Sequence, residues 1–128
     1  MQPSEPPYVS VLLVTFNHER YIAEAIGSVM AQDAPFPFEV VVSDDHSTDS
    51  TADVIRACAE RYPGRIRPFF NEHNIGAARN LVRTLQECRG RYIALLDGDD
   101  FWLSPAKLRR QVEYLDLNPG IAMELAIV

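Results

Sequence analysis

Residues 91–102 read Arg91-Tyr92-Ile93-Ala94-Leu95-Leu96-Asp97-Gly98-Asp99-Asp100-Phe101-Trp102. The apolar run at 92–96 is short and bounded by glycine and charge, which favours a strand buried on both faces of a sheet. It ends in three carboxylates placed around one glycine. Ligands of open α/β sheets bind at the carboxyl ends of the strands, so this stretch predicts a ligand site.

The three carboxylates at 97–100 repel one another, and a divalent cation with oxygen ligands would relieve that repulsion. The alternative without a ligand is a polar turn, because Asp and Gly are ordinary turn formers. A pattern as short as Asp-x-Asp does not by itself separate a turn from a metal site. The rest of the chain has to decide between them.

Length and composition indicate one globular domain. The chain has 128 residues, of which 47% are hydrophobic and 23% charged. Its net charge of −6 argues against nucleic acid or an anionic membrane as the main partner. The first seven residues include three prolines and show no periodicity, which predicts a disordered leader at 1–7 before a domain at 8–128. No stretch is long enough to span a membrane.

Predicted strands alternate with predicted helices along the chain. The strands fall at 8–15, 38–43, 66–70, 92–96 and 121–128, and the helices at 19–32, 50–62, 77–88 and 104–117. Ser50 and Asp53 are expected to form a reciprocal cap on the second helix. In the third helix the expected inner face comprises Ala78, Leu81, Val82 and Leu85. This alternation predicts an α/β fold with a doubly wound, mainly parallel sheet.

Polar side chains collect directly after the predicted strands. These residues are Asn17, Asp44, Asp45, Asn74 with Arg79, and the stretch 97–100. Because the carboxyl ends of parallel strands meet at one edge of the sheet, these groups should converge there. The histidines His18, His46 and His73 show no ligand-like spacing, so we interpret them as solvated loop residues.

Four segments in the right order resemble glycosyltransferase family 2, which has the GT-A fold with a Rossmann-like nucleotide-binding half. They are 9–17, ending in Thr-Phe-Asn; 38–49, containing Asp-Asp-His-Ser-Thr-Asp; 74–80, Asn-Ile-Gly-Ala-Ala-Arg-Asn; and 97–108, Asp-Gly-Asp-Asp-Phe-Trp-Leu-Ser-Pro-Ala-Lys-Leu. The resemblance covers about residues 9–117. Phe16 stands where the family usually has tyrosine, and the gap before Arg79 is shorter than in many members.

The resemblance implies a nucleotide-binding site made of Thr15, Phe16, Asn17, Asp45, Arg79, Asp97 and Gly98. Phe16 would stack on the base, Asp45 would accept a hydrogen bond from a base N–H, and Asp97 would bind ribose hydroxyls. Arg79 would meet a phosphate, although an exposed helix charge is an equal alternative. As a loop carboxylate, Asp45 is expected to contribute little to folding.

The same resemblance implies a metal, Mn²⁺ or Mg²⁺, bound by Asp99 on the diphosphate of the donor. Asp100 would orient that shell or the sugar. The metal would stabilise the departing nucleoside diphosphate as a Lewis acid. The donor would be a nucleotide-diphosphate sugar, with a UDP-sugar favoured, and the acceptor a hydroxyl, as on a growing glycan.

Family members invert the anomeric carbon with a carboxylate base supplied by an acceptor-binding half. This chain stops before that half, so we expect a donor-binding portion, truncated, with an unknown catalytic base. The implied location is the cytoplasm, including the membrane periphery, and exposed apolar surface would favour a homo-oligomer.

Two other classes compete with an enzyme. One is a non-catalytic module that binds a nucleotide-sugar or a partner, which the missing half makes a serious alternative. The other is a phosphoacceptor receiver domain, which is also doubly wound and has clustered aspartates. A receiver places its acidic pair after the first strand, where this chain has Phe16-Asn17, and its Lys precedes a Pro, whereas Lys107 follows one.

Overall fold

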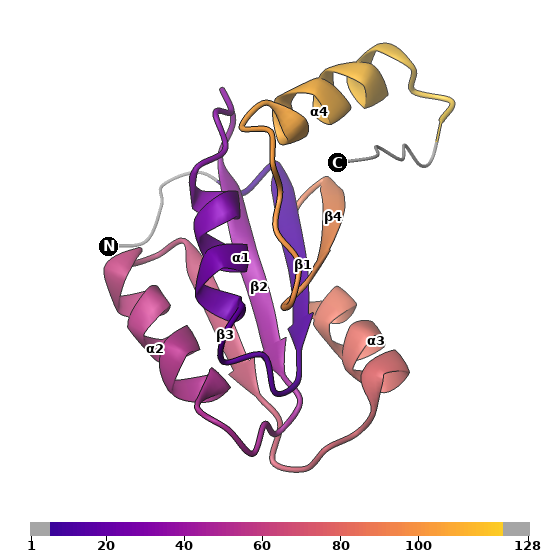
Figure 1. Cartoon of the computed structure of the whole chain (residues 1–128). Coiled ribbons are helices and arrows are strands. Elements are labelled where there is room, and N and C mark those ends of the chain that lie inside the picture. Colours follow the sequence, from indigo (N-terminus) through magenta and orange to yellow (C-terminus); the bar gives the residue numbers. More distant parts are fainter. Residues whose placement is uncertain (1–5, 122–128) are drawn as a thin grey trace.

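The computed structural model describes residues 6–121, in which strands and helices alternate along the chain. The elements are β1 (Val9–Thr15), α1 (Ile22–Met30), β2 (Phe38–Asp44), α2 (Thr51–Arg61), β3 (Ile66–Phe70), α3 (Ala77–Glu87), β4 (Tyr92–Asp97) and α4 (Lys107–Leu117). The four strands form one parallel sheet in the order β3-β2-β1-β4 (Figure 1). The predicted α/β fold is confirmed. Residues 1–5 of the predicted leader and 122–128 of the predicted fifth strand lie outside the described residues.

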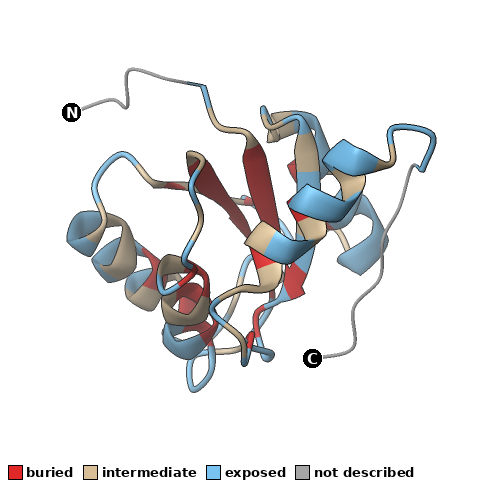
Figure 2. Ribbon diagram, turned by 90° about the horizontal axis from the view of Figure 1, so that it is seen from above, coloured by how far each residue is buried: buried red, intermediate tan, exposed pale blue. Residues whose placement is uncertain are grey.

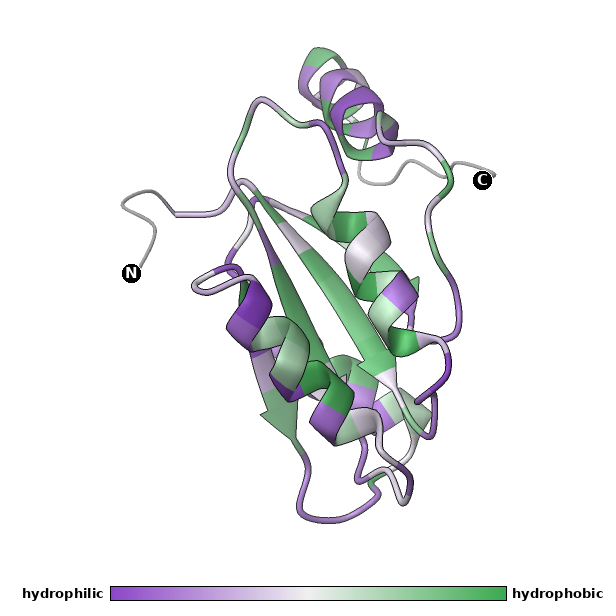
Figure 3. Ribbon diagram, turned by 60° about the vertical axis from the view of Figure 1, so that its left-hand side comes forward, coloured by the Kyte–Doolittle hydropathy of each residue, from purple (hydrophilic) through white to green (hydrophobic). Residues whose placement is uncertain are grey.

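The main hydrophobic core lies on the face of the sheet that carries α1 and α2. Alternate residues of β1 and β2 point into it, and the buried side chains of α1 come every third or fourth residue, as an amphipathic helix requires. Figure 2 shows the buried residues gathered in the central strands, and Figure 3 shows that these strands are hydrophobic. Within residues 6–121, no helix is long and apolar enough to cross a membrane.

The start of α2 differs from the expected reciprocal cap. Within the described chain, the Ser50 side chain makes no capping hydrogen bond. Asp49 takes that role one residue earlier, since its Oδ1 accepts hydrogen bonds from the backbone N–H of Thr51 at 2.9 Å and from the Thr51 hydroxyl at 2.5 Å. Asp53 instead pairs with Arg56 on the exposed side of the helix.

Helix α3 is rotated relative to its predicted orientation. Its buried residues are the polar Asn80 and Thr84, whereas Leu81, Val82 and Leu85 of the predicted inner face are exposed. Asn80 faces the sheet because its amide donates to the carbonyl of Ser43 at 3.2 Å and accepts from Asn71 at 2.9 Å. Hydrogen bonds at buried positions therefore set the rotation of this helix against its apolar periodicity.

Strand β4 was predicted to be buried on both faces, and this was wrong. It lies at the edge of the described sheet, next to β1 alone. On its α3 side, Ile93 is exposed and Leu95 is 63% exposed. Leu95 lines a hollow together with Leu81 of α3. We call the exposed large apolar residues of these two elements the α3–β4 surface. Its residues are Leu81, Val82, Leu85, Ile93 and Leu95.

We expect the 128-residue chain to self-associate through the α3–β4 surface, because contiguous exposed apolar patches of this kind drive association. Light scattering across a concentration series should show a mass above that of the monomer. Leu95→Lys should shift the equilibrium toward monomer. Leu117→Lys is the matched control, because Leu117 is exposed on α4 and outside this surface. A monomeric wild type, or an equal response of both variants, would contradict the expectation.

An ionic network around the buried Glu39 carboxylate connects the amino-terminal ends of the strands. Glu39 of β2 accepts hydrogen bonds from the Ser10 hydroxyl at 2.6 Å, from Arg89 at 2.8 Å and from Arg67 at 3.1 Å. Arg67 also donates to the backbone carbonyl of Glu87, the last residue of α3, at 2.8 Å. The network therefore fixes the carboxyl end of α3 at the edge opposite to the loops described next.

Candidate functional site

A pocket opens at the carboxyl edge of the sheet, where the loops after β1, β2, β3 and β4 meet. Its volume is about 390 Å³. It is lined by Val14, Thr15, Phe16, His18, Asp45, Asn74, Gly76, Ala77, Asn80 and Asp97. Four of the predicted site residues line it, namely Thr15, Phe16, Asp45 and Asp97. The predicted convergence of polar groups on one edge is therefore observed for these loops.

Phe16 combines a pocket position with an exposed ring. It directly follows the end of β1 and is 40% exposed, although it contributes to the pocket wall. A side chain of the hydrophobic core would be largely covered, so Phe16 is not a core residue. An aromatic face that is open to a pocket can stack on a planar ligand.

Asp45 is a structural residue as well as a pocket residue. It is only 3% exposed. Its Oδ1 accepts from the backbone N–H of Ile75 at 2.8 Å and from the Asn71 amide at 3.1 Å, and its Oδ2 accepts from the N–H of Gly76 at 3.0 Å. These contacts argue against the expectation that Asp45 matters little for folding, because this buried carboxylate anchors the loop that leads into α3.

The same contacts limit what Asp45 can do for a ligand. A carboxylate offers about four acceptor positions, and three are filled by the chain's own N–H groups. A single position remains for an N–H donor of a ligand. Asn74 also fixes the backbone at this position, because its side-chain amide donates to the Asp45 carbonyl at 3.1 Å.

Asn17 shapes the loops and is not among the residues that line the pocket. Its φ of 56° is left-handed, a conformation that Asn tolerates better than most residues. Its Oδ1 accepts from the backbone N–H of Thr48 at 2.8 Å, and its own N–H donates to the Ser47 hydroxyl at 2.9 Å. Asn17 therefore joins the loop after β1 to the loop after β2.

Gly98 lies where the β1 and β4 ends come closest. A Cβ atom at this position would lie 2.7 Å from the Cβ of Thr15 and 2.7 Å from Nδ1 of His18, and closer still to the Thr15 hydroxyl oxygen. Contacts this short are not tolerated, so only glycine fits. The Gly98 N–H donates to the carbonyl of Val14 at 3.0 Å, which continues the β1–β4 pairing into residues 97–100, here called the acidic loop.

The acidic loop is a hydrogen-bonded turn with outward-facing carboxylates. The N–H of Asp100 donates to the carbonyl of Asp97 at 3.0 Å, and the Asp100 carboxylate accepts from the N–H of Phe101 at 2.9 Å. The Asp99 side chain is 56% exposed. Among the described residues 6–121, no three His, Cys, Asp or Glu side chains gather closely enough to hold a metal ion by themselves.

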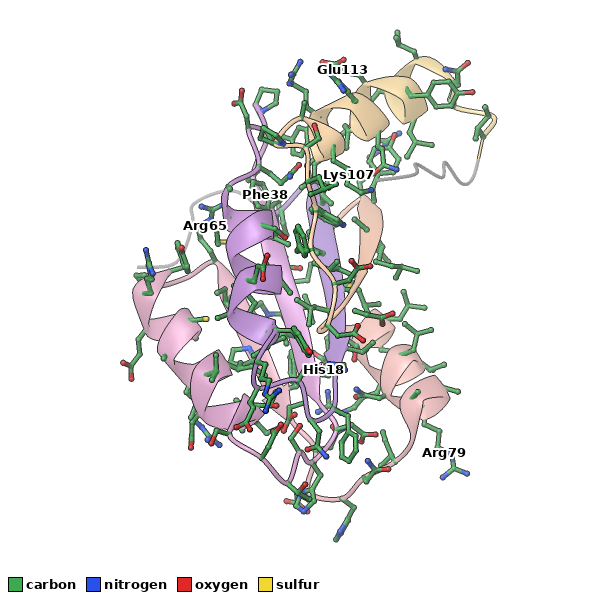
Figure 4. All side chains as sticks on the ribbon, in the orientation of Figure 1. His18, Phe38, Arg65, Arg79, Lys107 and Glu113 are labelled. Atoms are coloured by element: carbon green, nitrogen blue, oxygen red, sulfur yellow. The ribbon has the colours of Figure 1, made fainter. Side chains whose placement is uncertain are left out.

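Arg79 and His18 do not lie where the sequence suggested. Arg79 is on α3 and lines a separate hollow with Val82 and Arg83, and Figure 4 shows it directed away from the sheet edge. His18, interpreted from the sequence as solvated, lines the pocket instead (Figure 4). Its ring lies between Thr15 and Asp99, at 2.9 Å and 3.8 Å respectively. Sequence spacing could not reveal His18, because its neighbours come from two different strand ends.

Comparison with known proteins identifies the family. The family model described as glycosyl transferase family 2 matches residues 10–123. The chain belongs to glycosyl transferase family 2. This membership also excludes the receiver-domain alternative. The family resemblance found in the sequence is thereby confirmed, and the matched region contains every residue that lines the pocket.

Relatives that match most of this chain are longer than it is. A Mycobacterium tuberculosis protein is 44% identical over 111 residues, which cover 87% of this chain and 32% of that protein. The putative teichuronic acid biosynthesis glycosyltransferase TuaG of Bacillus subtilis is 38% identical over 109 residues, covering 85% of this chain and 42% of TuaG. The chain thus spans between about a third and two fifths of the length of these relatives.

Two solved structures are similar to the chain over most of its length. One is a mannosyltransferase of Pyrobaculum calidifontis in complex with GDP-Man and Mn²⁺, with a TM-score of 0.78 and 30% identity, covering 89% of this chain and 34% of that chain. The other is S. aureus TarS 1-349 in complex with UDP-GlcNAc, with a TM-score of 0.76 and 30% identity, covering 87% of this chain and 32% of that chain.

Proposed function

We propose that this family 2 chain binds the nucleotide part of a sugar donor, with a UDP-sugar favoured, for transfer of the sugar to an acceptor hydroxyl such as that of a growing glycan. The observation that carries the proposal is the pocket itself. It brings an exposed aromatic ring, a buried carboxylate with one unused acceptor position and a second carboxylate to one sheet edge. The aromatic ring can stack on a base, the buried carboxylate can accept from an N–H of that base, and the second carboxylate can accept from the hydroxyls of a ribose. The proposed place of action is the cytoplasm, including the membrane periphery.

Each residue has a role that its position supports. Phe16 stacks on the base, and Asp45 accepts the base N–H with its remaining lone pair. Asp97, at the end of β4 and on the pocket wall, accepts from ribose hydroxyls. Thr15, Asn17 and Gly98 shape the loops around the nucleotide. Arg79 lies on another surface, so the proposed site does not include it.

The residues at 97–99 fit a divalent metal that binds together with the donor. Mg²⁺ and similar ions usually take one or two protein carboxylates, with substrate phosphates and water as the remaining ligands. Asp99 is half exposed beside the pocket and can supply such a carboxylate. When bound there, Mn²⁺ or Mg²⁺ would supply Lewis-acid stabilisation of the charge that develops on the departing diphosphate.

Transfer with inversion requires an acceptor hydroxyl to attack the anomeric carbon from the face opposite the diphosphate, with a base to take its proton. We assign no catalytic base. A non-catalytic nucleotide-sugar module is the second candidate function. Sugar transfer to an added acceptor by the chain supports the enzyme and refutes the module, whereas nucleotide binding without transfer fits both the module and the donor-binding portion of an enzyme.

A calorimetric titration with UDP tests the base pocket. Asp45→Ala should weaken UDP binding by about 1–3 kcal/mol, because a charge-assisted hydrogen bond to the base N–H is lost. The variant should also unfold at a lower temperature, since Asn71, Ile75 and Gly76 lose their acceptor.

Two controls separate the hydrogen bond from damage to the loop. Wild type should bind the diphosphate of 3-methyluridine, which lacks this N–H, about as weakly as the alanine variant binds UDP. Asp53→Ala should bind UDP normally, because Asp53 is exposed on α2 and is not among the residues that line the pocket. Equal UDP affinities for wild type and Asp45→Ala would remove Asp45 from the site, and no UDP binding by wild type would refute the proposed function.

A further inference from the structure

The backbone of His18 is fixed by hydrogen bonds at both its N–H and its carbonyl, unlike that of a solvated loop residue. Its N–H donates to the hydroxyl of Thr51 in α2 at 2.9 Å. Its carbonyl accepts from the N–H groups of Tyr21 and Ile22, both at 2.9 Å, at the start of α1. Two helices therefore fix the position from which the imidazole projects, and a side chain placed by rigid elements can orient a neighbour.

The ring bridges the ends of β1 and β4. Nδ1 lies 2.9 Å from the hydroxyl oxygen of Thr15, and Nε2 lies 3.8 Å from Oδ2 of Asp99. The His18 side chain is only 24% exposed. Gly98 leaves the space for the ring, because a Cβ atom there would lie 2.7 Å from Nδ1. The imidazole is thus enclosed by Thr15 on one side and the acidic loop on the other.

The chemistry of the two neighbours decides the tautomer of a neutral ring. A carboxylate can only accept hydrogen bonds, so the nitrogen that faces Asp99 carries the proton. Nδ1 then has a lone pair, which accepts from the hydroxyl of Thr15. The 3.8 Å separation is longer than a hydrogen bond. A small rotation of the half-exposed Asp99 side chain, or one bridging water, closes it.

We propose that His18 is a positioning residue that turns the Asp99 carboxylate toward the diphosphate of the donor, through the chain Thr15 hydroxyl, His18 Nδ1, His18 Nε2–H and Asp99. This inference rests on the proposed function, since Asp99 is there the metal-binding carboxylate. Groups that orient a metal ligand typically change metal affinity by 10–100-fold when they are removed. Loss of His18 should therefore reduce the gain in nucleotide affinity that the metal gives, over and above any change in metal-free binding caused by removing a ring that lines the pocket.

Three substitutions of His18 separate the two ring nitrogens. His18→Gln carries an amide N–H near the position of Nε2 and can reach Asp99. His18→Asn places its amide near the position of Nδ1, beside Thr15 and short of Asp99. His18→Ala removes both contacts. UDP affinity is measured by calorimetry with and without Mn²⁺, and the melting temperature is measured for each protein.

The alanine and asparagine variants should lose about tenfold of the gain in UDP affinity that Mn²⁺ gives wild type, whereas the glutamine variant should keep most of it. A merely structural role would instead lower the melting temperature and weaken UDP binding by the same factor with and without Mn²⁺. A full Mn²⁺ gain in His18→Ala overturns the inference and leaves the proposed function standing. Loss in the glutamine variant equal to that in alanine also overturns it.

A ligand-free measurement keeps the test independent of nucleotide binding. The ¹⁵N signals of the His18 ring report its tautomer, and the expected state of wild type has a protonated Nε2 and an unprotonated Nδ1. Asp99→Asn should shift the Nε2 signal, because the neighbouring charge is removed. Unchanged ring signals in Asp99→Asn, or a proton on Nδ1 alone, overturn the inference. If wild type binds no UDP, the proposed function fails, and the role of His18 toward the diphosphate fails with it.

Discussion

Replacing Glu39 by alanine is expected to lower the free energy of unfolding by about 3 kcal/mol. This is the lower end of the range for breaking a buried ion pair, because Arg67 and Arg89 keep part of their contact with water. The Glu39 side chain is almost fully buried and accepts from both guanidinium groups and from Ser10. Its removal leaves these donors without their shared acceptor and releases the carboxyl end of α3.

Urea denaturation measures this effect, with Glu87→Ala as the matched control. Glu87 contacts the same Arg67, but at 3.5 Å and on the exposed side, so its removal should cost less than about 1 kcal/mol. Equal losses in the free energy of unfolding for the two alanine variants would show that Glu39 stabilises the fold no more than the exposed Glu87 does.

The stability that Glu39 contributes should depend on pH. Burial alone would raise the pKa of the Glu39 carboxyl, but hydrogen bonds from Arg89, Ser10 and Arg67 outweigh it and hold the pKa below its ordinary value of 4.5. A carboxyl with a lowered pKa stabilises the fold above the pKa of the unfolded chain, and this stabilisation is lost as the pH falls through the folded pKa. The difference in stability between wild type and Glu39→Gln should therefore shrink as the pH falls below 4.5.

Saturating Mn²⁺ is expected to tighten UDP binding roughly 5–150-fold, which corresponds to a coupling free energy of about 1–3 kcal/mol. Without a cation, the carboxylates of Asp97, Asp99 and Asp100 repel one another and an incoming diphosphate. A divalent ion is attracted to the carboxylates and attracts the phosphates in turn. Nucleotide should tighten Mn²⁺ binding by the same factor, because linkage is reciprocal. Calorimetry in both orders of addition measures the two values.

Two conservative variants separate the contribution of the metal to UDP binding from that of the ribose contacts. Asp99→Asn keeps the shape of the loop but removes one charge, so it should abolish most of the coupling and spare some metal-free binding. Asp97→Asn should weaken UDP binding and leave much of the coupling intact. Uridine, which has no phosphates, should show almost no response to Mn²⁺. An equal response of uridine and UDP, or an intact response in Asp99→Asn, would show that the acidic loop is only a polar turn.

Short-range sequence patterns predicted correctly those features that depend on residues close together in the chain. The strand ends, the order of strands and helices and the convergence of Phe16, Asp45 and Asp97 on one edge all follow from periodicity and parallel topology. The prediction for α3 was wrong, because Asn80 satisfies hydrogen bonds to Ser43 and Asn71 at buried positions. Those partners come from β2 and the loop after β3, and no window of sequence around α3 contains them.

Residue order and short-range spacing were enough to predict the α/β fold, the family and the edge of the sheet at which the pocket lies. Only the three-dimensional arrangement revealed that β4 has an exposed face, that Asp45 holds a loop and that His18 lies between Thr15 and Asp99. These features depend on side chains from separate strand ends that meet across a few ångströms. Such contacts depend on how whole helices and strands pack together, so they cannot be predicted from the spacing of residues along the chain.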